Sequence, residues 1–381
     1  MNALVDWLPR PGDEAYKYTS FAALARRKYA APAPGTVDAA QLPAPFGARL
    51  LFVDGRLQDR DGAPECGSGA PHRDLPESAT ALRKMNAALA TESITLDIPP
   101  DTDAGVIELL FASSDHATPV ASYPQVTVTV GANAKVTLVE RHVALGEAQD
   151  FTNLAIDMQV ARGACVTHIA LQQGATGAAL ATGLHATLAV DAQFDSHAVH
   201  LGGALVRADL TVTLAGRGAR CALYGVHLPG MRQHIDTHTR IEHMVRDTTS
   251  VEEYRAVVDR GGRSVFNGKV FVAKGADGTD AQQFNANLLL SEQAEADTKP
   301  ELEIYADDVK CAHGATVGKL DEAAMFYLRT RGIGVEAARS VLIWAFVETV
   351  LTKIPLADAR RSIEDAVLAR LPDAGLIGEF R

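Results

Sequence analysis

Apolar and polar residues alternate through the middle of this chain. Segments 93–98, 125–130 and 135–140 carry apolar side chains at every second position, which is the period of a strand with one buried face. Gly, Asn and Asp end many of these segments, and these residue types favour turns. The same alternation recurs in segments 187–190, 210–214, 265–272 and 302–305. We therefore predict short strands, one after another, from about residue 93 to about residue 305.

No long amphipathic helix interrupts this series of strands. That excludes a doubly wound α/β fold, because its parallel strands need helical crossovers. A sandwich, a barrel, a propeller and a β-helix solenoid stay open. The lack of a fixed sequence period speaks against propeller blades, and a solenoid tolerates irregular turns because each coil contacts only its neighbours. We therefore favour a mainly β fold with a parallel β-helix (solenoid) core over one closed barrel.

The two ends of the chain differ from the middle. Residues 1–95 combine helix-compatible stretches, 20–29 and 79–90, with one short apolar strand at 49–53. We predict an N-terminal helical or irregular region there, followed by the β-helix core over residues 96–316.

Residues 317–381 predict a small C-terminal helical domain. Asp321 can cap the first helix, which Gly332 can stop. A second helix, 335–351, has apolar residues at the i, i+3, i+4, i+7 spacing, and a third follows at 356–371. We expect these helices to cap the end of the solenoid, either packing only on that end and on one another or also offering a face to a partner.

Composition narrows the possible partners and the compartment. The net charge is −11 and the pI about 5.5, and an acidic chain without a basic stripe is a poor match for nucleic acid. The longest apolar run, 341–347, is far short of the roughly 20 residues that a membrane-spanning helix needs. The N-terminal residues lack the pattern of a secretory signal. We expect a cytoplasmic protein that binds neither nucleic acid nor membrane.

The four cysteines form no Cys-x-x-Cys pair. Their spread indicates neither a disulfide framework nor a zinc ribbon. Cys165 and Cys221 are expected to be buried thiols.

The most distinctive segment of the chain is 299–333, which includes the run His313-Gly-Ala-Thr-Val-Gly318. This segment closely resembles the signature of the scaffold family of the Suf iron–sulfur cluster assembly machinery. Within that family, its residues are most similar to those of the D component. Segments 223–239 and 283–291 also fit, and Glu14-Ala-Tyr-Lys-Tyr-Thr19 is similar to the family's opening, with Tyr16 where an aromatic residue is usual.

The resemblance implies a right-handed parallel β-helix with a helical C-terminal domain. It implies a non-enzymatic scaffold that pairs with a SufB-type subunit, docks a SufC-type ABC ATPase and forms a homodimer when isolated. A nascent cluster would form at the subunit interface, with no cofactor held stably by this chain alone. His313, a candidate metal ligand shared with the partner, and Cys311 match the interface position. Docking residues would be Phe326, Tyr327, Arg331, Trp344 and Phe346, although the last two are also typical core residues.

Spacing supports part of this picture independently. Cys311 and His313 are two residues apart, so on a strand both side chains lie on one face. Imidazole nitrogen and thiolate are iron ligands, but a cluster usually has four protein ligands. The shortfall indicates that a second chain supplies the rest.

Two other groups of residues were candidates for chemistry. His234, Asp236, His238, Arg240 and Glu242 share one face if extended, which fits either a metal site or, as we favour because of the arginine, a polar ladder. The stretches 262–270 and 314–320 imitate a phosphate loop but lack its spacing and its final Ser or Thr. The common hydrolase motifs do not occur.

Two alternatives remain open at this stage. One is a SufB-like scaffold that works as a homodimer and holds a cluster unaided. The other, from a different class, is a carbohydrate-active enzyme built on a β-helix.

Overall fold

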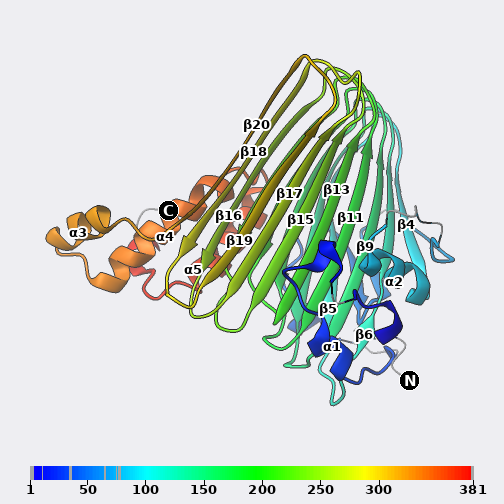
Figure 1. The fold of residues 1–381 in the computed structure, drawn as a ribbon. Helices are drawn as coiled ribbons and strands as arrows, with labels where there is room; N and C mark the ends of the chain where they lie inside the picture. Colours follow the sequence, from blue (N-terminus) through cyan, green and yellow to red (C-terminus); the bar gives the residue numbers. More distant parts are fainter. Residues whose placement is uncertain are drawn as a thin grey trace.

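Two ten-stranded sheets face each other in the computed structural model of the chain, which describes residues 4–10, 12–33, 37–63, 66–73, 75 and 79–378. From β7 onward, successive strands alternate between the sheets, and the whole forms a parallel β-solenoid of about eight turns (Figure 1). The prediction of a mainly β solenoid is confirmed. Pairing is parallel except where β1 meets β2 and β3 meets β4.

The strands follow one another in space in a simple order. The first sheet runs β2 (Arg56–Asp61), β1 (Ala48–Val53), β5 (Asp103–Ser113), β8 (Lys135–Ala144), β10 (Cys165–Gln173), β12 (Gln193–His200), β14 (Arg220–His227), β16 (Thr249–Val258), β18 (Thr279–Leu289) and β20 (Val309–Gly318). The second runs β19 (Glu295–Ile304), β17 (Arg263–Val272), β15 (His234–His243), β13 (Leu205–Leu214), β11 (Ala179–Leu188), β9 (Phe151–Val160), β7 (Gln125–Val130), β4 (Ser93–Ile98) and β3 (Cys66–Gly69), with β6 (Ala121–Ser122) beside β9.

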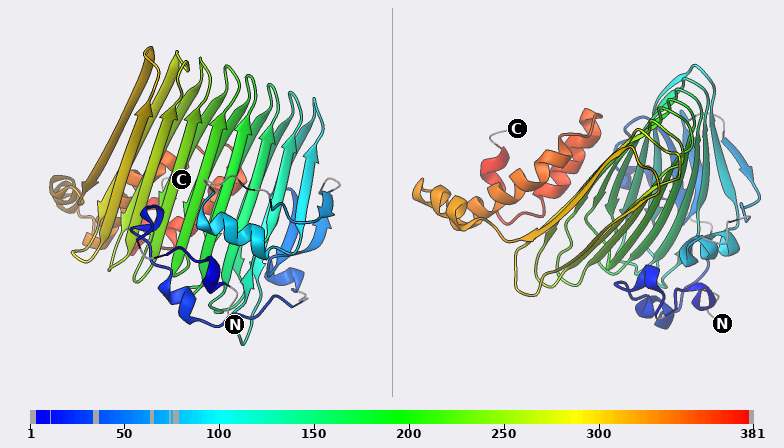
Figure 2. Two further views of the ribbon diagram at one scale, coloured as in Figure 1. Left: turned by 45° about the vertical axis from the view of Figure 1, so that its right-hand side comes forward. Right: turned by 45° about the horizontal axis from the view of Figure 1, so that its top comes forward.

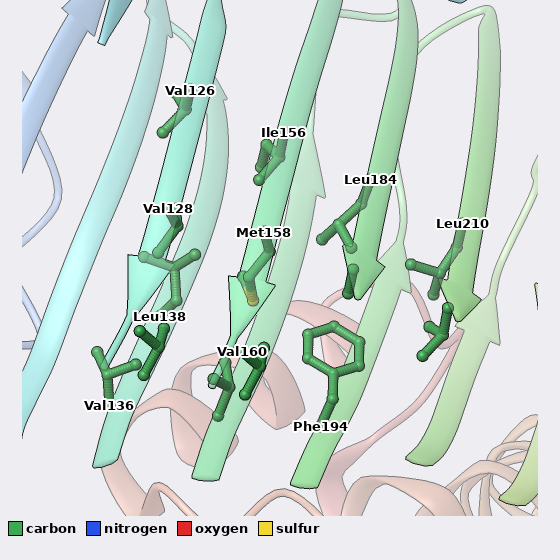
Figure 3. Close-up of a cluster of buried hydrophobic side chains, with 14 of the residues drawn as sticks. Val126, Val128, Val136, Leu138, Ile156, Met158, Val160, Leu184, Phe194 and Leu210 are labelled. Carbon is green, nitrogen blue, oxygen red and sulfur yellow. The ribbon is translucent and has the colours of Figure 1, made fainter. Parts of the chain in front are cut away.

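The inward side chains of the two sheets form the core. Val126, Ile156 and Leu184 each come from a different strand of the second sheet, and Val136 and Phe194 come from the first. All five are almost completely buried, and Figure 3 shows them in rows along the solenoid. Burial of one such side chain contributes about 1.5–3 kcal/mol. The alternation in the sequence is therefore the signature of this two-sheet interior.

One corner of the solenoid has the same backbone conformation in coil after coil. Asn133, Gly163, Asp191, Gly218 and Asp247 stand at successive corners with φ between 56° and 76°. They lie roughly 30 residues apart, a spacing within the usual range for solenoid repeats. A Cβ at Gly163 would come within 2.6 Å of the Asn133 side chain, so glycine is required there for space as well as conformation. This near-repeat is a signal of the solenoid that the search for a fixed period missed.

The C-terminal helices pack on the side of the solenoid and not on its end. They are α3 (Glu322–Thr330), α4 (Val335–Leu351), α5 (Ala357–Leu368) and α6 (Gly375–Gly378). Helix α4 contacts β14 and β16 on the outer face of the first sheet, where Ile343 and Val347 are buried. The expectation that these helices cap the end of the solenoid is wrong, because the apolar side chains of α4 pack against apolar residues on the outer face of the first sheet, such as Val226 and Val257.

Helix α3 is capped as predicted. The Asp321 carboxylate accepts hydrogen bonds from the backbone N–H groups of Ala323 and Ala324 at 2.8 and 3.2 Å, and Gly332 has a φ of 87°. No side chain of α3 is buried, and the helix projects away from the solenoid (Figures 1 and 2).

The N-terminal region covers the opposite outer face (Figure 2). It contains α1 (Ala22–Arg26), α2 (Ala81–Leu89) and the 3₁₀ turns at Val5–Trp7, Glu14–Tyr16 and Ala39–Gln41. Helix α2 packs on β9 and β11, where the Asn86 amide donates to the carbonyls of Pro124 and Asn153 at 3.0 and 2.6 Å. Strands of the solenoid begin in this region, since β1 pairs in parallel with β5.

A candidate site at the open end of the solenoid

Strand β20 forms the last edge of the first sheet. It pairs with β18 on one side, and no other strand in the described part of the chain pairs with its far edge. Seven of its ten residues are exposed, Val317 by 50%. An unpaired edge presents a row of backbone donors and acceptors that a further strand can bind. The solenoid is thus open at this end.

Cys311 and His313 lie on this edge strand and face the same way. Their register partners on β18 are Ala281 and Gln283, both buried in the interior. Side chains in register lie on the same face of a sheet, so Cys311 and His313 point toward the solenoid axis at its open end. The predicted common face is therefore present. Their role in cluster assembly stays a prediction.

The two side chains differ in their exposure to solvent. Cys311 is partly buried against a small apolar cluster that includes Ala281 and Val309, and burial raises the pKa of its thiol. His313 is exposed. An imidazole that is accessible to solvent can bind a metal ion or a group from a second chain without any rearrangement of the solenoid.

A polar row leads inward from His313. Behind it lies Gln283, whose Nε2 donates to Glu252 Oε2 at 2.6 Å. Gln283 Oε1 is buried without a hydrogen-bond partner among the described residues, and Gln283 is the register partner of His313. Burial raises the pKa of Glu252 to about 7, although the hydrogen bond from Gln283 opposes that rise. An ionisable carboxyl is thus linked by one amide to the position beside His313.

Further along the solenoid interior, the buried polar side chains include histidines. His227 bridges the two sheets through Ser264 Oγ at 3.1 Å and Thr237 Oγ1 at 3.0 Å. Its ring centre lies 5.6 Å from that of His200. Burial lowers the pKa of His200 to about 4 and of His227 to about 3, so both are neutral at physiological pH. Sequence reasoning missed this row; its only signal is a polar residue at positions where the alternation predicts an apolar one.

The alternating run on β15 is a polar ladder and not a ligand set. Arg207 Nη1 donates to Asp236 Oδ2 at 2.6 Å, Thr19 donates to the same oxygen, and His238 Nε2 lies 3.2 Å from Oδ1. Burial opposes ionisation of Asp236, but Arg207 and these hydrogen bonds hold the pKa of the carboxyl below its usual range. Arg240 likewise donates to Glu242 at 2.6 Å. Arginine side chains form ion pairs with the carboxylates that a metal ion would need as ligands.

The five predicted docking residues fall into two groups. Phe326 and Tyr327 of α3 are 71% and 57% exposed, and the Arg331 guanidinium lies 5.2 Å from the Tyr327 ring centre. Trp344 of α4 is only 7% exposed. Phe346 is partly buried, with the Arg255 guanidinium 5.0 Å from its ring centre. The structure places two of the five on one exposed helix, with Arg331 directly after its end, and packs the other two against the solenoid.

Two of the other cysteines also differ from each other. Cys221 is buried as predicted, and burial raises the pKa of its thiol well above the ordinary value. The prediction for Cys165 is wrong: its side chain is partly exposed, because it stands at the first position of β10, beside a corner. The described residues include no helix with the length and apolar character to span a bilayer.

Fold and site together define a class: a parallel β-solenoid whose last strand, with one unpaired edge, carries a Cys and a His on one face. Residues 111–346 match the family described as "SUF system FeS cluster assembly, SufBD core domain". The chain belongs to this SufBD family of iron–sulfur cluster assembly proteins and is a homologue of SufD.

Individual relatives extend the similarity over almost the whole chain. The chain is 31% identical to the iron–sulfur cluster assembly protein SufD of Escherichia coli, over 96% of this chain and 90% of that protein. It is 30% identical to an iron–sulfur cluster assembly SufBD family protein of Synechocystis sp., over 95% of this chain and 87% of the relative.

Proposed function

We propose that this chain is a non-catalytic scaffold subunit of a cytoplasmic iron–sulfur cluster assembly complex. It pairs through β19 and β20 with a SufB-type subunit and binds a SufC-type ABC ATPase through its C-terminal helices. The observation that carries the proposal is the open terminal coil, where Cys311 and His313 face the solenoid axis beside an unpaired strand edge.

The ligand count explains why a second chain is needed. An iron–sulfur cluster usually takes four protein ligands, and this end of the chain offers one thiol and one imidazole. A partner strand added to β20 would continue the sheet through backbone hydrogen bonds and would bring its own side chains next to His313. The nascent cluster is then cargo shared between two subunits, and this chain alone holds no stable cofactor.

His313 carries more of the proposed chemistry than Cys311. The exposed imidazole needs no proton loss to bind iron if it is neutral, whereas a thiol must ionise first, and burial raises the pKa of Cys311. Gln283 Oε1, buried and unpartnered behind His313, is suited to accept a hydrogen bond from the imidazole and so hold its orientation.

Exposed aromatics support the proposed contact with the ATPase. Phe326 and Tyr327 stand on α3, a helix with no buried side chain. Large exposed aromatic residues are typical anchors of protein interfaces. Trp344 and Phe346 would then support the base of this helical surface and not contact the partner directly.

Substitution of His313 tests the shared site. In a complex made with its SufB-type and SufC-type partners, His313→Ala is expected to leave assembly intact and to lower cluster formation at least tenfold, because the imidazole is lost from the interface. Absorbance of the reconstituted cluster and iron content measure the effect. His185→Ala is the matched control, since His185 is exposed on the outer face of β11. A wild-type cluster yield in His313→Ala would refute the assignment.

A further inference from the structure

A second group of metal-binding residue types lies at the other end of the first sheet. Asp54 follows β1, His116 lies in the loop between β5 and β6, and Asp150 immediately precedes β9. Potential ligand atoms of these three side chains all lie within 4.8 Å of one another. β1 and β20 stand near opposite ends of the sheet order, so this group is separate from the Cys311 and His313 end.

The two carboxylates are buried and held in place. Asp54 and Asp150 are each 5% exposed. Asp54 Oδ1 and Oδ2 accept hydrogen bonds from the backbone N–H and the hydroxyl of Ser114 at 2.9 and 2.8 Å, and Asp150 Oδ1 accepts from the Val120 N–H at 2.7 Å. His116 Nε2 lies 3.1 Å from Asp54 Oδ1. Fixed carboxylates on a rigid scaffold are what a metal site requires.

One oxygen of the group lacks any partner. Asp150 Oδ2 is shielded from solvent and has no hydrogen-bond donor among the described residues. Burial raises the pKa of Asp150, and the nearby Asp54 raises it further, whereas the Val120 N–H, His116 and Arg27 lower it. Arg27 Nη1 donates to the backbone carbonyls of Gln149 and Gly177. A buried carboxylate oxygen without a donor is costly, and a cation at this point would satisfy it.

We propose that Asp54, His116 and Asp150 bind one divalent transition-metal ion, such as zinc, manganese or iron(II). Two carboxylates and an imidazole form a nitrogen–oxygen ligand set that suits these ions. Water fills the remaining coordination positions on the side where the His116 side chain is 20% exposed. A cavity of about 310 Å³ reaches Asp54.

The ion would fasten three segments that are distant in the sequence. Asp54 directly follows the first parallel strand, His116 belongs to the loop that leads to β6, and Asp150 directly precedes a strand of the second sheet. Both sheets would thus be linked at the N-terminal end of the solenoid, where few coils stabilise one another. The role is structural and independent of the proposed function at β20.

Metal binding by the full-length chain tests the proposal. The purified protein is treated with a chelator and titrated with Mn²⁺, followed by electron paramagnetic resonance of free Mn²⁺, and with Zn²⁺, followed by calorimetry. One equivalent is expected to bind, and Zn²⁺ is expected to raise the melting temperature, because a ligand that binds only the folded state stabilises it. Asp150→Asn and His116→Ala are each expected to weaken binding at least tenfold and to abolish the shift in melting temperature.

Three controls make the result decisive. Asp115→Asn changes an exposed carboxylate in the same loop and should bind metal like the wild type. The Cys311→Ser/His313→Ala double variant should also bind normally, which separates this site from the other end of the solenoid. Circular dichroism of His116→Ala, a change at the most exposed of the three residues, guards against misfolding. Undiminished binding in both Asp150→Asn and His116→Ala, or no binding by the wild type, would overturn the proposal.

Discussion

At the scale of single residues, the interior of this solenoid combines apolar rows with ionisable groups whose pKa values burial shifts in favour of the neutral form. Glu252 is the clearest case, since burial raises its pKa from 4.5 to about 7. The folded chain therefore holds a proton on Glu252 more tightly than the unfolded chain does. The contribution of this group to the free energy of unfolding is fully present below pH 4.5. It decreases as the pH rises toward 7 and then levels off.

Glu252→Gln is expected to remove that pH dependence. The amide keeps the shape of the protonated carboxyl, so the variant should match the wild type near pH 4.5. At pH 8 it should be more stable by about 3 kcal/mol, the free energy that the pKa difference represents. Urea unfolding across this pH range measures the effect, with the exposed Glu292→Gln as the control. If the free energy of unfolding depended on pH equally in Glu252→Gln and in the wild type, the raised pKa of the Glu252 carboxyl would be refuted.

At the scale of elements, two neighbouring helices of the C-terminal region have different tasks. Helix α4 buries Trp344 and Ile343 against the first sheet, whereas α3 buries none of its side chains. The apolar residues of α4 account for its packing. Helix α3 contacts α4, but its Phe326 and Tyr327 stay exposed, which is why we connect these two residues with the ATPase.

Substitutions in the two helices should separate stability from binding. The Phe326→Ala/Tyr327→Ala double variant is expected to leave the melting temperature unchanged and to weaken ATPase binding more than tenfold, because exposed aromatics contribute only to the interface. Trp344→Ala should lower the free energy of unfolding by about 3 kcal/mol through loss of core packing. Thermal melts and calorimetry with the ATPase subunit measure both. Destabilisation by the double variant with unchanged binding would reverse the assignment.

At the scale of the whole molecule, the solenoid is closed on its sides and open at one end. N-terminal segments cover the outer face of the second sheet and α4 covers that of the first. The last coil has neither cover, and it exposes Tyr305 by 61% and Val317 by 50%. A solenoid end without a cap is prone to associate.

The isolated chain is therefore expected to form a dimer through this end when its partner is absent. Val317→Lys should shift the dimer to monomer, because a charged side chain on an edge strand opposes strand pairing. Size-exclusion chromatography with light scattering measures the mass. Val190→Lys, at an exposed valine near a corner of the solenoid, should remain dimeric. A monomeric wild type, or a Val317→Lys variant that still forms the dimer, would rule out this interface.

Local patterns in the sequence determined much of this molecule. The alternation from residue 93 predicted the strands, because a side chain on a strand points to one face or the other regardless of what lies beyond. The helical bounds around Asp321, Gly332 and segment 335–351 also came from local chemistry, in which a cap or an apolar stripe depends on residues within a few positions. The common face of Cys311 and His313 followed from the same two-residue period.

Only the tertiary structure decided the features that depend on residues far apart in the chain. The row from His313 through Gln283 to Glu252 and the group of Asp54, His116 and Asp150 arise because the coil returns to the same place every turn. The spacing between such neighbours varies with each corner, so no local pattern reveals them. Trp344 is buried because α4 packs on the first sheet. The position of the helices on the side of the solenoid likewise depends on an apolar outer face of the first sheet that residues from several coils form together.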